Sequence, residues 1–236
     1  MKNQYFADRH DFYKYDLCFE LMRSVGELQR FVFAAMLTPD DESSDGAFTG
    51  YDPGTRDAEL HGFLQGCLQR GQRDVRHLRE FYQARQFSWT YEPVLEPVLA
   101  REEDLEPYFA GLLSRDLDRA LVLLDPDNGL TVQSTGSSTR CKYVGYDHVA
   151  RVYEACGPTS VILIFQHNAR CKWPAKLEVL GRELRERSGV EHLSCIAPDG
   201  LVAYFVATKS AGRAAEVGRA LFEYGERHGC RHVLQV

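Results

Sequence analysis

Two apolar runs restrict the possible folds of this chain most strongly: "RALVLL" at 119–124 and "SVILIFQH" at 160–167. Strands that are apolar on both faces are typical of a parallel sheet covered by helices on both sides. Segments with helical spacing of apolar residues lie at 145–156 and at 174–189, and the second ends on a glycine. The sequence therefore predicts an α/β protein with a mostly parallel, doubly wound, Rossmann-like sheet.

The last part of the chain predicts an antiparallel addition to this sheet. Residues 191–209 contain two strand-like runs around a Pro-Asp-Gly turn, which is the chemistry of a hairpin. A last helix is predicted at 211–229, and weaker patterns in the first half predict helices at 12–26, 55–69, 73–83 and 102–115 and strands at 30–37 and 87–95. No repeat or long linker divides the chain, so we expect one α/β domain over residues 1–236.

Composition limits the class of protein. The 236 residues are 44% hydrophobic and 26% charged, which are ordinary globular values. No apolar stretch reaches the length of a membrane span, and the polar start lacks a signal-peptide core, so we expect a cytoplasmic protein without membrane contact. The seven cysteines form no CxxC pair and are expected to be buried and reduced, with reactive or ligating thiols at Cys141 and Cys171 as the alternative.

Charge is unevenly distributed along the chain. Residues 1–138 hold 14 basic and 24 acidic side chains, whereas residues 139–236 hold 14 basic and 10 acidic side chains. The net charges are therefore −10 and +4. An acidic half suits cations and a basic half suits an anion, although solvated faces without a partner would give the same pattern.

Polar residues follow three predicted strands at the point where each strand ends. Asp40 and Asp41 follow 30–37, and "DPDN" follows 119–124. Gln166 and His167 end the run at 160–167. Ligands of parallel sheets bind outside the carboxyl ends of the strands, so these exits are the predicted functional edge.

The paired motifs "LTPDD" and "LDPDN" predict a cation site. If their strands are neighbours, four carboxylates share one space and need a cation or protons to compensate their repulsion. Oxygen ligands of this kind suit Mg²⁺ or Mn²⁺. The predicted ligands are Asp40, Asp41, Asp125 and Asp127. The alternative is that these residues only cap turns and helices.

Other polar segments offer further candidates. His167 is a general acid/base or phosphate-binding residue, or a structural histidine. The loop at 134–143, with Arg140 and Lys142, resembles a phosphate cradle or is a plain loop. Near the N-terminus, aromatic residues alternate with polar residues that include His10, Asp11 and Lys14. They predict stacking on bases, or a helix N-terminus with Asp11 as its cap.

Taken together, these segments resemble the class I methyltransferases, and most closely the ribosomal-RNA adenine-N6 methyltransferases that carry a DPPY motif. The segment "ADRHDFYKYDLCFELM" is similar to the leading helix of that family, with matches at Ala7, His10, Asp11 and Lys14. "LVLLDPDNG" lies where the family has its apolar strand and DPPY motif. The resemblance covers most of the chain and implies the fold predicted above and S-adenosylmethionine as cofactor.

Two departures separate the chain from that family. The family's glycine-rich cofactor loop is replaced by "TPDDESSDG", whose first glycine is Gly46. The second proline and the tyrosine of the motif, which shape the pocket and stack on the target base, are Asp127 and Asn128. Asp125 matches the first motif residue, which implies that it accepts a hydrogen bond from a base amine. When a protein shares the fold of a family but differs from it in the site residues, the fold does not imply the family's function.

Three functions remain open. The leading hypothesis is a divalent-cation-dependent nuclease or phosphohydrolase that acts on nucleic acid or a nucleotide. Its predicted catalytic residues are Asp125, Asp127, His167 and Lys142, and its predicted substrate-binding residues are His10, Asp11, Lys14, Arg140, Asn128 and Gln166. The second is methyl transfer from S-adenosylmethionine to a base or another amine, with Asp125 orienting the amine. The third is a non-catalytic binding module on the same fold.

Overall fold

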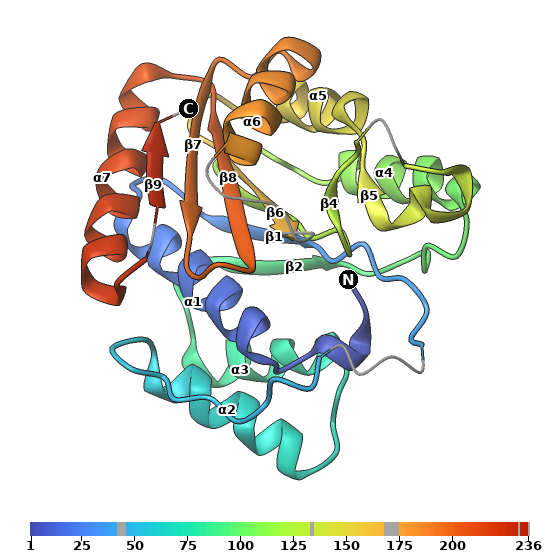
Figure 1. Cartoon of the computed structure of the whole chain (residues 1–236). Helices are drawn as coiled ribbons and strands as arrows, with labels where there is room; N and C mark the ends of the chain where they lie inside the picture. The colour runs from blue at the N-terminus through green and yellow to red at the C-terminus, as the bar shows by residue number, and fades with distance from the viewer. Residues whose placement is uncertain (42–45, 133–134, 168–174, 231, 236) are drawn as a thin grey trace.

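The computed structural model describes residues 1–41, 46–132, 135–167, 175–230 and 232–235, and its centre is a seven-stranded sheet (Figure 1). The strands lie in the order β2-β1-β3-β6-β8-β7-β9. Their bounds are β1 Arg30–Ala34, β2 Thr90–Val94, β3 Ala120–Leu124, β6 Val161–His167, β7 His192–Ala197, β8 Val202–Thr208 and β9 His232–Gln235. The first four strands in this order are mutually parallel, and β8 pairs antiparallel with both β6 and β7. The predicted mostly parallel Rossmann-like sheet is confirmed.

Helices cover both faces of the sheet. On one face lie α1 Arg9–Ser24, α2 Ala58–Gln69, α3 Leu78–Arg85 and α7 Ala211–His228, whose buried side chains share one core. The other face is covered by α4 Leu105–Leu113, α5 Tyr146–Ala155 and α6 Ala175–Ser188. Short 3₁₀ helices lie at Asn3–Tyr5, Val75–His77, Glu102–Asp104 and Ser137–Lys142, and a two-stranded sheet joins β4 Gly129–Leu130 to β5 Tyr143–Val144. The result is a three-layer arrangement.

Side-chain alternation explains why the strands are apolar throughout. Phe31 and Phe33 of β1 lie in the core beneath α1, whereas Val32 and Ala34 lie in the core on the opposite face. All five residues of β3 are buried. A strand buried on both sides needs apolar residues at every position, and this is the pattern read from the sequence.

The predicted hairpin is also confirmed. β7 and β8 are antiparallel neighbours, joined by a turn in which the Asp199 carboxylate accepts hydrogen bonds from the backbone N–H groups of Leu201 (2.7 Å) and Val202 (3.0 Å). β9 pairs antiparallel with β7 on its outer side. In the described part of the chain, no helix combines the length and apolar character that crossing a membrane requires.

The arrangement of β1 and β3 fixes the functional edge. They are parallel neighbours, with Ala34 opposite Leu124, so both carboxyl ends leave the sheet at the same edge. The chain passes from β1 to β2 on one side and returns to β3 on the other. The crevice between the ends of β1 and β3 is therefore a topological switch point, the place where open α/β sheets bind ligands.

Candidate functional site

The chain's own first residues fill this switch-point crevice. The amino group of Met1 donates hydrogen bonds to the backbone carbonyl of Met36 (2.9 Å) and to that of Asp125 (3.2 Å). The backbone N–H of Thr38 donates to the Met1 carbonyl (2.7 Å). Figure 1 marks the N-terminus at this edge of the sheet. The first residue thus bridges the ends of β1 and β3, where a bound ligand would be expected.

Three of the four aspartates predicted as metal ligands find partners in this N-terminal segment. Asp127 lies 3.1 Å from the Met1 amino group and accepts a hydrogen bond from the Thr38 hydroxyl (2.8 Å). Burial raises the pKa of Asp127, but these two contacts outweigh it and hold the pKa below its usual value. Asp41 pairs with Lys2, and Asp40 accepts from the backbone N–H of Gln4 (3.1 Å).

The fourth aspartate, Asp125, belongs to a buried cluster with Lys14. The Lys14 ammonium donates to Asp11 Oδ1 (2.6 Å) and to Asp125 Oδ2 (2.7 Å). The Tyr15 hydroxyl donates to the other oxygen of Asp11 (3.1 Å). Burial lowers the pKa of Lys14, but the two carboxylates outweigh it, so the pKa is raised and the ammonium stays charged. Burial raises the pKa of Asp11 and of Asp125, and Lys14 offsets this only in part.

These contacts bear on the predicted metal site. Among the residues that the structure describes, no three His, Cys, Asp or Glu side chains form a group that could hold a metal ion. The predicted proximity of the two strands is right, but Asp40 is exposed and Asp125 is buried against Lys14. The reason is that the first 14 residues supply the positive charge that the sequence assigned to Mg²⁺ or Mn²⁺. The donor set does not fit a divalent ion here.

Beside the filled crevice lies an open cavity of about 570 Å³, which we call the acidic pocket. It is bounded by the N-terminal end of α1, the ends of β3 and β6, and the β7–β8 turn. Aromatic rings from Tyr5, Phe48 and Phe165 contribute to its walls. The remaining lining residues are Met1, Asp8, His10, Asp11, Lys14, Gly46, Ala47, Asp125, Pro126, Asp127, Asn128, His167 and Leu201.

The N-cap of α1 is Asp8, not the predicted Asp11. The Asp8 side chain accepts a hydrogen bond from the backbone N–H of Asp11 (2.9 Å), and the helix begins at Arg9. Ala7 precedes it in the left-handed region, with φ of 68°. Asp8 is 4% exposed, and burial raises its pKa above the usual value. The buried cap that faces the pocket is thus a carboxyl group with a raised pKa.

A contact between α1 and the β7–β8 turn closes one side of the pocket. His10 Nε2 lies 3.4 Å from the Asp199 carboxylate. Burial raises the pKa of Asp199, but His10 and the turn's backbone N–H groups outweigh it and lower the pKa overall. The aromatic N-terminal segment is therefore a helix start held against the sheet, which is one of the two alternatives given by the sequence.

The structure brings together only part of the predicted site. The predicted residues that line the pocket are Asp125, Asp127, Asn128, His10, Asp11, Lys14 and His167, and those that do not are Asp40, Asp41, Arg140, Lys142 and Gln166. Gln166 instead bridges backbone groups: its side chain accepts from Leu130 N–H (2.9 Å) and donates to the carbonyl of Asn128 (3.2 Å). Arg140 and Lys142 lie in the 3₁₀ helix Ser137–Lys142, outside the pocket lining.

The structure describes one of the two cysteines that the sequence analysis named as possible reactive or ligating thiols. Cys141 is buried, and burial raises the pKa of its thiol, so it matches the inert structural alternative. Cys171 lies outside the described residues.

Sequence reasoning missed several pocket residues, chiefly Phe48, Phe165 and Leu201. The glycine at position 46 was a sequence signal for a close contact of its loop. Its φ is 84°, and a Cβ there would lie 2.4 Å from the Gln4 carbonyl oxygen, so only glycine lets this loop pack against the N-terminal segment. Phe165 was hidden inside an apolar strand, where nothing in the sequence distinguishes a pocket wall from a core residue.

The crevice also bears on the expected cofactor. By the resemblance, S-adenosylmethionine would lie against the backbone after β1, but in the described part of that segment Met1 already bonds to the Met36 carbonyl and to the Thr38 N–H. The residues present do not fit the cofactor there. No protein-family model matches the chain, and a search of curated proteins finds no match.

Proposed function

We propose that the acidic pocket binds a small planar ligand through an amino group, of the kind carried by a nucleobase, and exchanges protons with that group. The observation that carries the proposal is an excess of carboxyl groups over cations on the pocket floor. Asp8, Asp11 and Asp125 are all buried there, and Lys14 is the ammonium in contact with two of them.

Charge favours an amine over a phosphate. The Met1 amino group is paired with Asp127, and Lys14 is shared between two carboxylates. Within the described chain, Asp8 has no cation at ion-pair distance. A phosphate entering this pocket would meet uncompensated negative charge, whereas an amino group would donate to a carboxylate. The pocket therefore supports the amine expected from the resemblance better than the phosphate substrate of the leading sequence hypothesis.

The walls suit a planar ring. Tyr5, Phe48 and Phe165 present aromatic surface beside the carboxyl groups, and Leu201 adds an apolar edge. Aromatic faces attract amino-bearing and cationic rings, and nucleobases stack on them. A volume of about 570 Å³ is in the usual range for a small-molecule site.

The chemistry available to this chain is general acid–base catalysis at nitrogen. Burial raises the pKa of Asp8 and Asp11, which is the direction that proton exchange by a carboxyl group near neutral pH requires. Asp8 faces the pocket and is the proposed proton-exchanging residue. Lys14 is a positioning residue, because it holds Asp11 and Asp125 in place.

The direct test compares adenosine with inosine by titration calorimetry, because the two differ by the exocyclic amino group. We expect adenosine to bind and inosine to bind at least about tenfold more weakly. Asp8→Asn keeps a good N-cap but loses the charge, and should weaken adenosine binding by about tenfold. Asp40→Asn is the matched control, since Asp40 is exposed and outside the pocket.

Two outcomes would contradict the proposal. Equal affinity for adenosine and inosine would show that the pocket does not recognise the amino group. Absence of adenosine binding would show that the pocket does not bind ligands of this class. A separate thermal-unfolding experiment with added Mg²⁺ or Mn²⁺ tests the metal hypothesis. A rise in melting temperature that Asp125→Asn abolishes would support that hypothesis instead.

A further inference from the structure

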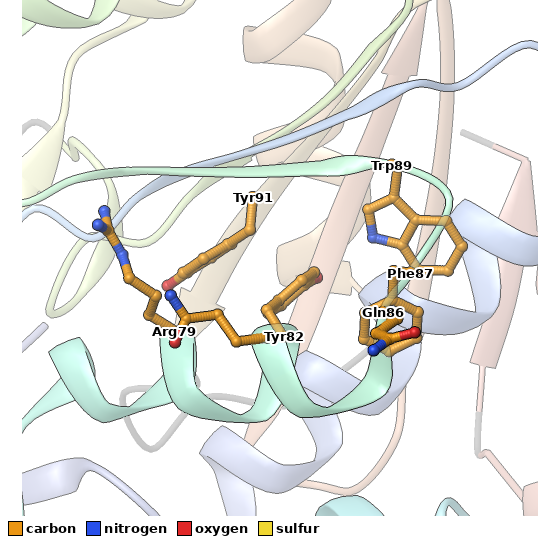
Figure 2. Close-up of a pocket in the computed structure, with 7 residues that line it drawn as sticks. Arg79, Tyr82, Gln86, Phe87, Trp89 and Tyr91 are labelled. Carbon is orange, nitrogen blue, oxygen red and sulfur yellow. The ribbon is translucent and has the colours of Figure 1, made fainter.

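A second pocket of about 360 Å³ lies between α3 and the edge strand β2 (Figure 2). It is lined by Arg79, Tyr82, Gln83, Gln86, Phe87, Trp89 and Tyr91. Figure 2 shows Arg79 and Tyr91 toward one end, Phe87 and Trp89 toward the other, and Tyr82 between them. None of these residues belongs to the acidic pocket.

Stacked aromatic pairs give this pocket a rigid shape. The rings of Tyr82 and Tyr91 stack with centroids 4.3 Å apart and planes 9° apart. Phe87 and Trp89 stack at 4.5 Å and 19°. The first pair joins α3 to β2 and fixes the two elements relative to each other, and the second pair lies within the segment that connects them. Rings held in this way form a preorganised surface for another planar group.

An unpartnered polar atom points to a ligand. Tyr91 Oη is buried and makes no hydrogen bond to any part of the chain that the structure describes. Tyr82 Oη and Trp89 Nε1 are also buried, and the partner that each has is the other. Tyr82 is 6% exposed. Buried polar atoms are nearly always hydrogen-bonded, so the Tyr91 hydroxyl calls for a partner from outside the chain, and the Tyr82 and Trp89 groups beside it have bonding capacity left over. All three groups can donate a hydrogen bond, which selects a ligand with acceptors such as ring carbonyls.

The charge at the rim selects an anion. Arg79 is exposed, and across the residues described it makes no ion pair with a carboxylate. Figure 2 shows its side chain extending from α3 toward β2, beside Tyr91. Gln83 and Gln86 add amide groups to the pocket lining, and Figure 2 shows Gln86 at the other end, beside Phe87. An unpaired guanidinium next to an aromatic surface suits a phosphate or carboxylate attached to a ring.

The strand edge itself is unsuited to a peptide strand. Thr90 N–H donates to the Gln29 carbonyl on the β1 side, so the alternate residues Tyr91 and Pro93 face their backbone groups outward. Pro93 has no N–H, and proline at an edge strand blocks further pairing. A small molecule seated on the side chains is therefore the better occupant than an added strand.

We propose that this pocket, which we call the aromatic pocket, binds a small anionic ligand with a planar ring bearing carbonyl acceptors. The ring stacks against the aromatic side chains and accepts hydrogen bonds from the tyrosine hydroxyls and the indole N–H, and the anion pairs with Arg79. The proposal does not depend on the function of the acidic pocket, because it requires no amino group.

Trp89 provides a local readout. The chain contains two tryptophans, Trp89 and Trp173, so Trp173→Phe leaves Trp89 as the single emitter. Uridine 5′-monophosphate is the probe, because its ring carries two carbonyls and no exocyclic amine. We expect saturable quenching of Trp89 emission by this probe. Uridine, without the phosphate, and ribose 5-phosphate, without the ring, should each bind at least about tenfold more weakly.

Substitutions test separately the ion pair with the anion and the hydrogen bonds to the ring. Arg79→Ala should weaken the probe about tenfold or more, whereas Arg76→Ala, which removes an arginine paired with Asp74 and Glu96, should leave its affinity unchanged. Tyr91→Phe, which removes one unpartnered hydroxyl, should weaken it about threefold or more. Absence of saturable quenching, or equal affinities for the probe in the parent and Arg79→Ala proteins, would overturn the proposal.

Discussion

The switch-point crevice and the floor of the acidic pocket lie side by side and use the same residue type in opposite ways. In the crevice, Asp127 is balanced by the Met1 amino group and the Thr38 hydroxyl, and its pKa is lowered. On the floor, Asp8 and Asp11 outnumber the cation beside them, and burial raises their pKa values. The difference shows that a buried aspartate acquires its role from the partners that the fold supplies, whether it follows a strand, as Asp127 does, or begins a helix, as Asp8 does.

Of the substitutions that test this comparison, Lys14→Met is expected to change the free energy of unfolding most. The substitution leaves Asp11 and Asp125 buried without their shared cation, and removing one partner of a buried ion pair costs about 3–5 kcal/mol. We expect the free energy of unfolding, measured by urea denaturation, to fall by about that amount.

The control for this prediction is Lys142→Met, which changes a half-buried lysine outside the pocket and should alter stability by less than about 0.5 kcal/mol. Adding Asp125→Asn to the Lys14→Met protein should restore part of the loss, because one uncompensated charge disappears. Equal, small effects of the two lysine substitutions would show that Lys14 does not neutralise the floor.

A second, smaller effect concerns pH. Carboxyl groups with raised pKa values stabilise the folded state most below the unfolded-state pKa, near 3.8, and this contribution is lost as pH rises through their folded-state pKa values. Asp11→Asn removes one such group. Between pH 4 and pH 7, unfolding free energy should therefore fall less steeply with rising pH in this variant than in the parent.

Asp127→Asn gives the opposite pH dependence for comparison. Because the pKa of Asp127 is lowered, its contribution to stability changes with pH in the direction opposite to that of Asp11. Its stabilisation is present above the usual pKa of 3.8 and is lost as pH falls through its folded-state value. This variant should lose less stability than the parent on acidification below pH 4. Identical pH profiles for the parent and both variants would contradict the assignment of the two environments.

The smallest effect is expected in the crevice from Thr38→Val. The change removes the hydrogen bond to Asp127 and keeps the shape of the side chain. A hydrogen bond to a charged group contributes about 1.5–3 kcal/mol, and the nearby amino group remains to compensate Asp127, so we expect a loss toward the lower end of that range. Thr131→Val, another buried threonine that bonds to a backbone carbonyl, is the matched control.

Much of the fold could be predicted because its signals are local. The apolar runs that became β3 and β6 are buried on both faces, and the Pro-Asp-Gly turn between β7 and β8 forms the expected hairpin. The metal hypothesis required β1 and β3 to be neighbours, and they are.

The site was less predictable because it depends on contacts between distant parts of the chain. Lys14 lies 111 residues from Asp125, and Met1 lies 124 residues from it. Sequence patterns place carboxylates at a strand end but do not reveal which cation meets them. The metal was inferred from four acidic groups in isolation, whereas the N-terminal segment supplies their partners.

The most direct test of the central claim is a pH titration of the aspartate side-chain carboxyl carbons by NMR. Assignments come from the Asp8→Asn, Asp11→Asn and Asp125→Asn proteins. We predict that the floor carboxyl groups titrate above the usual value of 3.8, while Asp127 titrates below it. Titration of Asp8, Asp11 and Asp125 all at or below 3.8 would contradict an excess of buried carboxyl groups over cations.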